Sequence, residues 1–489
     1  MTNKLVKNYI ASIKGKNIHV LGAAGTEGAA IVTFLFKHGI TTITAHDFQP
    51  NLKAFRQQFK ATHATLTAKQ RARQLKNIIN DDIKINLKRN YLKGILKADL
   101  VFLTQAWFIY PPNFPTIQKL FDKKIPVSSM TKLYLELANC TTIGVTGSQG
   151  KSTTTTLIVD ILKTAGKKVY VAGNYRDLDS QPLAKIDQFQ PTDYLIMEMS
   201  NRQLNLDMKI SPNIAVVTNI YPNHVEEHGS YSNYKKAKAN ILKYQKKSDI
   251  AVLNEDNSIT RQFMKKVKGK LYKTSLKEKV KKGAFLENDT IFVNNKELIN
   301  INQLPIVGQH NYHNILNALA AISAVQSFRR NDSPIAQSKI IKTLKKFRGI
   351  THRLQKVAVI NGVTYIDDLK STTPTAAINA INAFPNAKLW HIMGGWHKHV
   401  PHDQLAKLID KRVHHLIALP GTASNETIVE LKNIKSNVPV TKFKDIFSAV
   451  EYVQANAKKG DIVLMSPAGA YFQREHLKNK YKLKSLIKN

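Results

Sequence analysis

A glycine-rich turn with a lysine and a run of hydroxyls, inside the stretch Thr141–Thr156, carries the clearest chemistry in this sequence. A β-branched run ahead of it predicts a short buried strand, and the turn then opens a helix. Glycines let backbone N–H groups approach phosphate oxygens, a helix N-terminus adds positive potential, lysine neutralises β/γ-phosphate charge, and a hydroxyl can hold Mg²⁺. The pattern predicts a nucleotide-phosphate loop made of Gly147, Ser148, Gln149, Gly150, Lys151, Ser152 and Thr153.

The spacing of this turn is G-x-x-G-x-x-G-K-S-T, from Gly144 to Thr153. Strict Walker spacing would need a glycine where Val145 stands, so an ordinary strand-to-helix turn without a ligand is the alternative. The lysine and three hydroxyl-bearing residues in register after the last glycine favour phosphate binding.

Length and composition limit the class of protein. A chain of 489 residues is too long for one hydrophobic core, so we expect two to four domains. The single cysteine, Cys140, excludes an intrachain disulfide and suits a reducing compartment. The sequence has neither a signal-peptide core nor an apolar run of membrane-spanning length, and a soluble cytoplasmic protein is expected.

The formal charge of +39 allows two interpretations. It could serve a nucleic acid or an anionic membrane, or it could be a solvated basic surface. The lysines are scattered along the whole chain, and no RNA-binding or zinc-finger signature accompanies them. This distribution favours the solvated surface, which would also attract a polyanionic small substrate.

The first part of the chain predicts a Rossmann-like unit. A strand at 17–22 leads through a turn with Gly25 and Gly28 into an apolar helix, and a second strand ends in Asp47. The spacing G-x-x-G-x-x-G differs from the dinucleotide fingerprint G-x-G-x-x-G. A ligand site and glycines that only let a helix pack on a sheet both stay open.

In the middle of the chain, three polar residues follow or interrupt apolar elements. Glu198 ends a continuously apolar strand, where a carboxylate is unfavourable unless a cation or metal pairs with it. His224 lies in the loop after the next strand, and Lys238 lies on a helix. The elements expected in this region are strands at 194–200, 213–219 and 249–256, a helix at 231–244, short β-hairpins at 265–300 and a helix from about Asn311.

A second α/β sheet is predicted after Phe347. Two alternating runs flank Asn361 and Gly362, which is a strong hairpin signal. Four further apolar runs alternate with helical stretches, as in a parallel sheet: KLWHIMG, HHLIALP, VPVTKF and DIVLMSP.

Six motifs, in the family's order and across nearly the whole chain, resemble those of the Mur ligase family, the ATP-dependent amino-acid ligases of peptidoglycan precursor synthesis. They are GVTGSQGKSTTTT, EMSNRQL, NIYPNHVEEHGSYSNYKKAKANI, GQHNYHN, FRGITHRLQKV and IDDLKSTTPTA. The resemblance implies an α/β fold of three domains: a Rossmann-like UDP-substrate domain at 1–139, a central P-loop ATPase-like parallel-sheet domain at 140–346, and a Rossmann-like amino-acid-binding domain at 347–489.

The resemblance also implies a reaction. EMSNRQL is similar to the element of the branch that adds D-glutamate to UDP-N-acetylmuramoyl-L-alanine, so ATP would phosphorylate the acceptor carboxylate and the amine would displace phosphate. Lys151 and two Mg²⁺ ions would offset the repulsion between the carboxylate and the γ-phosphate. The implied partners are these small molecules, with no specific nucleic acid and no membrane insertion, and the enzyme is expected to act as a monomer.

Residue roles carried over from the family are expectations of the same kind. Lys151, His224 and Lys238 would be catalytic, with Lys238 carbamylated by CO₂. The metal ligands would be Ser152, Thr153, Glu198, His224 and Lys238, and the ATP contacts outside the loop would be Asn311, Asn314, Arg353 and Asp368. The substrate residues would be Gly25, Thr26, Asp47, Ser200, Gln203, Lys370, Thr372, Lys398, Tyr471 and Phe472.

Ordinary structural roles remain open for several of these residues. Glu198 could belong to a buried ion pair, His224 could cap a loop, and Lys238 could be a solvated helix lysine. Arg353 and Asp368 could form a structural ion pair.

The chain departs from the family pattern at four places: at Asn223, at Arg202, at TQAWF (residues 104–108) and at SPAGAYFQREHL near the C-terminus. Because these changes bear on the nucleotide and amino-acid pockets, a Mur-type ligase for another amino acid or acceptor is an alternative. A basic nucleic-acid-binding ATPase and a catalytically weakened, partner-binding member of the family also stay open.

Overall fold

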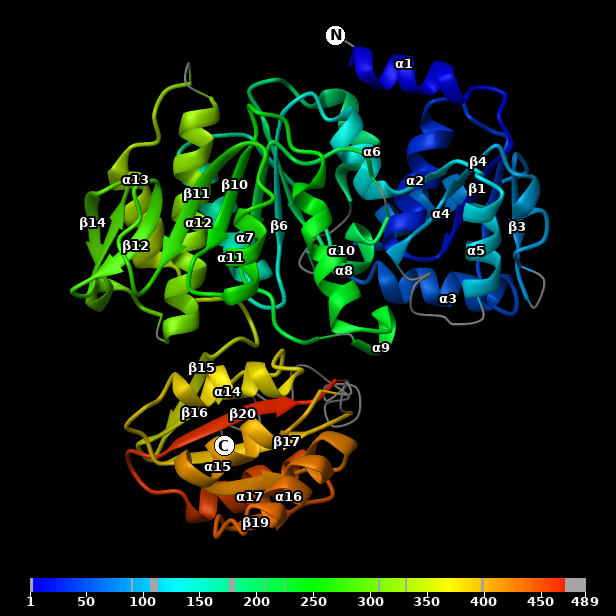
Figure 1. The fold of residues 1–489 in the computed structure, drawn as a ribbon. Helices are drawn as coiled ribbons and strands as arrows, with labels where there is room; N and C mark the ends of the chain where they lie inside the picture. The colour runs from blue at the N-terminus through cyan, green and yellow to red at the C-terminus, as the bar shows by residue number, and fades with distance from the viewer. Residues whose placement is uncertain are drawn as a thin grey trace.

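Three β-sheets organise the molecule (Figure 1). In that view the blue first part and the green middle part lie side by side, and the yellow-to-red last part lies beneath them. The computed structural model describes residues 3–88, 91–105, 113–175, 181–206, 208–223, 225–306, 308–329, 332–396 and 400–470. The predicted three-part α/β architecture is confirmed.

The first sheet has five parallel strands in the order β3-β2-β1-β4-β5. Strands β1 and β2 are buried along their whole length, as expected for parallel strands covered by helices. The strands are β1 (Ile18–Leu21), β2 (Ile43–His46), β3 (Ile83–Asn86), β4 (Leu100–Phe102) and β5 (Val127–Ser128). The helices are α1 (Lys4–Ile13), α2 (Thr26–Lys37), α3 (Leu52–Thr62), α4 (Ala68–Ile78), η1 (Ile95–Lys97), α5 (Phe114–Asp122) and α6 (Met130–Leu137).

The second sheet has nine strands in the order β14-β13-β12-β11-β10-β9-β6-β8-β7. The chain leaves β6 on one side to form β7 and β8 and then continues on the other side with β9, so β6 lies at a topological switch point. Ligands of such sheets bind outside the carboxyl ends of the strands at this point. The strands are β6 (Thr141–Thr146), β7 (Val169–Gly173), β8 (Tyr194–Glu198), β9 (Ile214–Val217), β10 (Ile250–Asn254), β11 (Lys270–Ser275), β12 (Gly283–Glu287), β13 (Thr290–Val293) and β14 (Lys296–Asn300).

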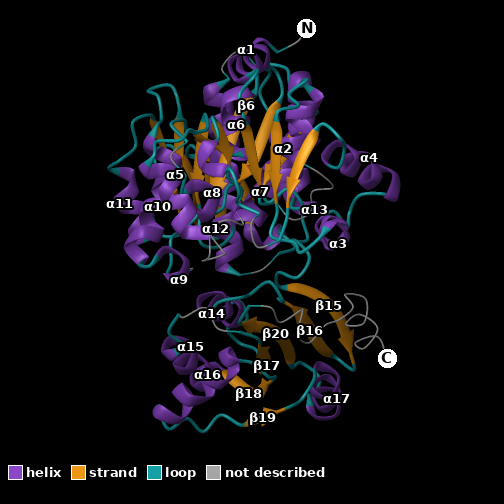
Figure 2. Cartoon of the chain, turned by 90° about the vertical axis from the view of Figure 1, so that its right-hand side faces the viewer, coloured by secondary structure: helices purple, strands orange, loops and turns teal. Residues whose placement is uncertain are grey.

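The helices of the middle part include α12, whose residues after the first turn are mostly buried against the second sheet. Two very short helices, α8 and α9, follow strands β8 and β9. Figure 2 shows α9 at the lower end of the upper part of the molecule, above the third part. The helices are α7 (Lys151–Thr164), η4 (Pro182–Gln188), α8 (Asn201–Leu204), α9 (Val225–His228), α10 (Tyr231–Lys243), α11 (Ser258–Met264), η5 (Ile301–Gln303), α12 (Gln309–Phe328) and α13 (Gln337–Lys346).

The third sheet has six strands in the order β15-β16-β20-β17-β18-β19. Its first two strands form the predicted antiparallel hairpin, and the positive φ angles of Asn361 (50°) and Gly362 (77°) explain why this dipeptide makes the turn. The elements of this part are β15 (Gln355–Ile360), β16 (Val363–Asp367), α14 (Pro374–Asn382), β17 (Leu389–Gly394), α15 (Asp403–Arg412), β18 (Val413–Ala418), α16 (Thr422–Asn433), β19 (Val440–Lys442), α17 (Ile446–Asn456) and β20 (Ile462–Ala468).

The first two parts share a core. One apolar cluster joins Phe34 and Leu35 of α2 to Leu183 and Ile186 of η4, whereas the third part has clusters of its own. Burial of this shared apolar surface stabilises the first two parts against each other.

The prediction of hairpins throughout 265–300 was wrong at its start. Strand β11 pairs parallel with β10, and the antiparallel pairs begin only with β12 and β13. Strand β11 contains both half-buried and buried residues, a mixture that does not distinguish a parallel strand from a hairpin strand. Helix α4 was not predicted from the sequence, because Ile78 is the one residue of this helix that is buried.

Among the described helices, none has both the length and the apolar character that crossing a bilayer requires.

Candidate active site

The glycine-rich loop lies between the carboxyl end of β6 and the first turn of α7. Gly147 and Gly150 have φ angles of 149° and 78°, which side-chain-bearing residues rarely adopt. The Lys151 ammonium folds back over the loop and donates to the carbonyl oxygens of Gly147 (2.9 Å) and Ser148 (3.1 Å). The lysine charge therefore lies directly at the mouth of the turn.

Hydrogen bonds to the segment after β9 and to helix α10 hold the loop in place. The N–H groups of Ser148 and Gln149 donate to the carbonyl and side-chain oxygens of Asn219, at 2.8 and 2.9 Å. The Ser148 hydroxyl lies 2.9 Å from the Tyr234 hydroxyl. Since these N–H groups are engaged, the donors left for an anion are those of the first turn of α7, which have no partner within a helix.

Glu198 and Lys238 come together beside this loop. Glu198 ends β8 and Lys238 lies on α10, and both are buried, with 3% and 1% of their surface exposed. The Lys238 amine donates to the Thr146 hydroxyl at 3.0 Å, and that hydroxyl donates to the Met199 carbonyl at 2.7 Å. The interpretation of Lys238 as a solvated helix lysine is wrong.

Burial governs the protonation of Lys238. Its pKa is well below the ordinary lysine value because burial penalises the ammonium, and the charge of Lys151 adds to this effect against the opposing attraction of Glu198. A buried neutral amine is the form that reacts with CO₂, so carbamylation fits this position.

A cation also fits beside Glu198. The Oε2 atom of Glu198 is buried and accepts no hydrogen bond from the described residues. Leaving a buried carboxylate oxygen without a partner is costly, and a bound cation would remove that cost. Among the described residues, no three His, Cys, Asp or Glu side chains cluster as metal ligands, and the predicted ligand His224 lies outside those residues.

The predicted adenine residues start α12, next to the loop. Asn314 is buried, and its Oδ1 atom lies 2.0 Å from the position that a Cβ on Gly150 would take. Asn311 lies one turn earlier on the same helix and is partly exposed. Helix α12 therefore packs against one side of the glycine-rich loop.

The third part of the chain reaches this loop through α14. The Asn379 amide donates to the side chain of Gln149 at 2.8 Å. Predicted residues Lys370 and Thr372 lie in the connection from β16 to α14, both partly exposed. Helix α14, which follows this connection, is thus in contact with the glycine-rich loop.

Asp368, at the start of that connection, is buried. Burial raises its pKa to about 7, against the hydrogen bond from Ser466 (2.9 Å) and the charge of Arg353. The charge of Arg353 also contributes, after burial and His313, to holding the pKa of His310 at about 4. The charge of Arg353 therefore acts both on Asp368 of the third part and on His310 at the start of α12.

In the first part, Gly25 and Thr26 form the start of α2, and Asp47 follows β2. Asp47 is buried, and its carboxylate accepts from the Ala24 N–H at 2.9 Å. Burial raises its pKa against this bond. Asp47 thus holds the glycine turn in place, whatever ligand the turn binds.

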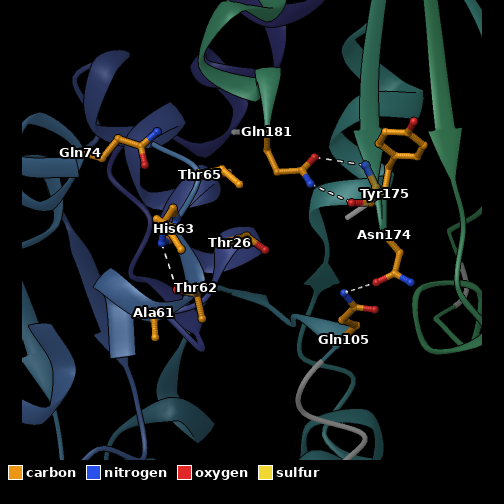
Figure 3. Close-up of a pocket in the computed structure, with 13 residues that line it drawn as sticks. Thr26, Ala61, Thr62, His63, Thr65, Gln74, Gln105, Asn174, Tyr175 and Gln181 are labelled. Atoms are coloured by element: carbon orange, nitrogen blue, oxygen red, sulfur yellow. Dashed lines mark hydrogen bonds between the residues drawn. The ribbon is translucent and has the colours of Figure 1, made fainter. Parts of the chain in front are cut away.

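A cavity of about 320 Å³ lies beside Thr26, between the first two parts (Figure 3). Its walls are hydroxyls, amides and small side chains, and Figure 3 shows the Gln105 and Asn174 amides joined by a hydrogen bond at 3.2 Å. The lining residues are Thr26, Ala30, Ala61, Thr62, His63, Ala64, Thr65, Gln74, Gln105, Gly173, Asn174, Tyr175 and Gln181.

Comparison with known proteins settles the family. Residues 145–325 match the Mur ligase middle domain, and residues 352–469 match the glutamate ligase domain of Mur ligases. The chain is 32% identical over 462 residues to the UDP-N-acetylmuramoylalanine–D-glutamate ligase of Clostridium tetani, which covers 92% of this chain and 95% of that protein. The chain belongs to the Mur ligase family.

Two further comparisons agree with this assignment. The protein of the same name from Acetivibrio thermocellus is 33% identical over 481 residues, covering 96% of this chain and 95% of that one. The solved structure of the MurF ligase from Thermotoga maritima in complex with ADP has a TM-score of 0.56 over 93% of this chain and 91% of that chain. Its identity is 16%, so it supports the Mur ligase fold alone.

Four of the predicted site residues of this Mur ligase lie outside the described residues: His224, Lys398, Tyr471 and Phe472. Ser152 and Thr153 lie in the first turn of α7, and Ser200 and Gln203 lie at the start of α8. The sequence reasoning missed Glu27 and Gln105, which contact this α8 segment from the first part. The available signal was a glutamate, Glu27, between the two glycines Gly25 and Gly28.

Gly150→Ala should weaken both the fold and nucleotide binding. An alanine at φ 78° costs about 1–2 kcal/mol, and its Cβ would also meet Asn314 Oδ1. We expect a lower melting temperature together with a roughly tenfold or larger loss of ATP affinity by calorimetry. Gly166→Ala is the matched control: its φ is also 78°, but a Cβ there meets nothing within 4 Å. It should lower only the melting temperature, and equal ATP affinities of the two variants would contradict the placement of Gly150.

Proposed function

We propose that this chain adds D-glutamate to UDP-N-acetylmuramoyl-L-alanine at the expense of ATP, as its relatives' name describes. The observation that carries the proposal is the convergence of Lys151, Glu198 and Lys238 at the carboxyl edge of the second sheet. The similarity to D-glutamate ligases over more than nine-tenths of the chain supports the choice of substrates.

The reaction proceeds in two displacements. An oxygen of the acceptor carboxylate attacks the γ-phosphorus of ATP, ADP leaves, and an acyl phosphate forms. The amine of D-glutamate then attacks the acyl carbon, phosphate leaves, and the nitrogen loses a proton as the amide forms. Both attacking and attacked groups are anionic in the first displacement, so positive charge at the site lowers its barrier.

The chain's own residues supply placement and charge. Lys151 would neutralise the phosphates, the first turn of α7 would donate N–H groups to them, and Asn314 would face the adenine. Glu198, with carbamylated Lys238 and His224, would hold a Mg²⁺ ion, and Ser152 or Thr153 would hold a second. Mg²⁺, when bound, screens phosphate and carboxylate charge.

The third domain completes the proposed site. Arg353 and Asp368 would meet ATP on closure of this domain, while Lys370, Thr372 and Lys398 would bind the amino acid together with Tyr471 and Phe472. The contact between Asn379 and Gln149 supports such an approach. The proposed boundaries of the three domains are 1–139, 140–346 and 347–489, and the proposed enzyme is a cytoplasmic monomer.

Phosphate release across a panel of acceptors and amino acids tests this function. Turnover should require ATP, UDP-N-acetylmuramoyl-L-alanine and D-glutamate together, with one phosphate released per amide detected by mass spectrometry. Release with UDP-N-acetylmuramate and L-alanine would move the chain to another Mur activity. ATP hydrolysis stimulated by RNA, with a steep salt dependence, would overturn the ligase assignment.

A further inference from the structure

A buried polar bridge joins the first domain to the segment after Glu198. The Glu27 carboxylate, in the first turn of α2, accepts from the Gln105 N–H and from the Gln203 amide, both at 2.6 Å. The Ser200 hydroxyl donates to the Gln105 side chain at 3.0 Å. The two domains are therefore joined by four residues that follow the carboxyl ends of strands β1, β4 and β8.

The bridge uses the polar atoms of helix α8. Ser200 and Gln203 form a capping box, in which the Ser200 N–H donates to Gln203 Oε1 at 2.9 Å and the Gln203 N–H donates to Ser200 Oγ at 3.2 Å. Glu27, Ser200 and Gln203 are each at most 6% exposed. The polar side-chain atoms of Ser200 and Gln203 are therefore bonded to other protein groups. The bond from the Gln203 amide to Glu27 connects this capping box to the first domain.

The opposite side of α8 is held by the segment that follows His224. Arg202 makes a two-point ion pair with Glu227, with Nε to Oε2 at 2.8 Å and Nη2 to Oε1 at 2.5 Å. The Asn201 amide lies 2.8 Å from a ring nitrogen of His228. Arg202, a departure from the family pattern, therefore ties α8 to α9.

We propose that Glu27 is a positioning residue. Through its contact with α8, it fixes the position of the first domain relative to Glu198 at the end of β8. The inference rests on the proposed function, since the muramoyl substrate must extend from the first domain to Glu198. Ser200 and Gln203 take part in this positioning through their contacts with Gln105 and Glu27. Glu27 does not touch the reacting atoms in this scheme.

The alternative is that Glu27 only stabilises the fold. Geometry separates the two roles, because α8 begins three residues after Glu198, which is the last residue of β8. A displacement of α8 would move Glu198 relative to the first domain, and misplacement by about 1 Å can cost on the order of 100-fold in rate.

A carboxylate–amide exchange tests the bridge. In Glu27→Gln, the oxygen of the introduced amide is needed to accept from the backbone N–H of Gln105. Its NH₂ group then faces the NH₂ group of Gln203, so two donors oppose each other. In Gln203→Glu, two carboxylates face each other. Each single change should lower kcat/KM for UDP-N-acetylmuramoyl-L-alanine by roughly 10- to 100-fold, with the KM for ATP unchanged.

In the double change, Glu27→Gln with Gln203→Glu, every hydrogen-bond donor of the bridge again faces an acceptor. The introduced amide accepts from Gln105 and donates to the introduced carboxylate, which still accepts from the Ser200 N–H. Recovery of kcat/KM to within about threefold of the wild type is expected. Absence of recovery, with the double variant folded, would overturn the positioning role.

Asp187→Asn is the control for loss of an interdomain contact as such. Asp187 pairs with Lys37 and His38 across the same two domains, at 3.3 and 2.9 Å, away from α8. The kcat/KM of Asp187→Asn should match that of the wild type. A loss of kcat/KM equal to that of the bridge variants would mean that losing any contact between the two domains has this effect.

Hydrogen–deuterium exchange gives a readout independent of turnover. Exchange at 198–204 should rise in each single variant and return to the wild-type level in the double variant. If the wild type shows no ligase activity but the exchange pattern is as expected, the proposed function fails and the bridge stands. Unchanged exchange in the single variants would contradict the bridge.

Discussion

Lys151→Ala is expected to abolish turnover while leaving the protein folded. The Lys151 ammonium lies over the loop, within 2.9 and 3.1 Å of two of its carbonyls, and is partly exposed, so it is not a core residue. Removal of one preorganised charge-stabilising donor costs about 10²–10³-fold in kcat, and the loss here falls on the displacement that joins two anions. Phosphate release with saturating substrates measures it.

The control for this variant is Lys151→Arg. It keeps the charge, but a planar guanidinium cannot fold into the same turn, so it should recover only part of the activity. The melting temperatures of both variants should stay within a few degrees of the wild type, since surface-facing changes alter stability little. Lys151→Ala with wild-type turnover would remove the phosphate-loop role.

The glycine-rich turn between β6 and α7 could be predicted from the sequence because its signals are local. Glycines, lysine and hydroxyls are contiguous, and the positive φ angles of Gly147 and Gly150 follow from the residue type. The hairpin at Asn361 and Gly362 was predictable for the same reason.

Long-range pairing was not predictable in this way. The parallel pairing of β11 with β10 depends on contacts with neighbouring strands, and the residue pattern of β11 alone does not determine it. The contact between Glu27 and Gln203 links residues 176 positions apart, and the individual sequence segments contain no sign of it. The family resemblance supplied the roles of Glu198 and Lys238, and the structure added that both are buried.

Lys238→Ala is expected to lose most activity and to regain part of it in the presence of a short carboxylic acid. The amine is buried beside Glu198 and Lys151, where an ammonium would repel a cation and add to the charge of Lys151. Reaction of the neutral amine with CO₂ forms an N–C bond and releases a proton, which leaves an anionic carbamate. Acetate or formate in the space left by alanine would replace that negative charge.

Two measurements distinguish carbamylation from a structural role of Lys238. Wild-type enzyme incubated with ¹³C-bicarbonate should show a carbamate carbon signal by NMR that Lys238→Ala lacks, and depletion of CO₂ should lower turnover. Lys236→Ala, an exposed lysine on the same helix, should leave both unchanged. Loss of activity in Lys238→Ala without rescue or a carbamate signal would mean that the amine itself, through its bond to Thr146, supports the loop.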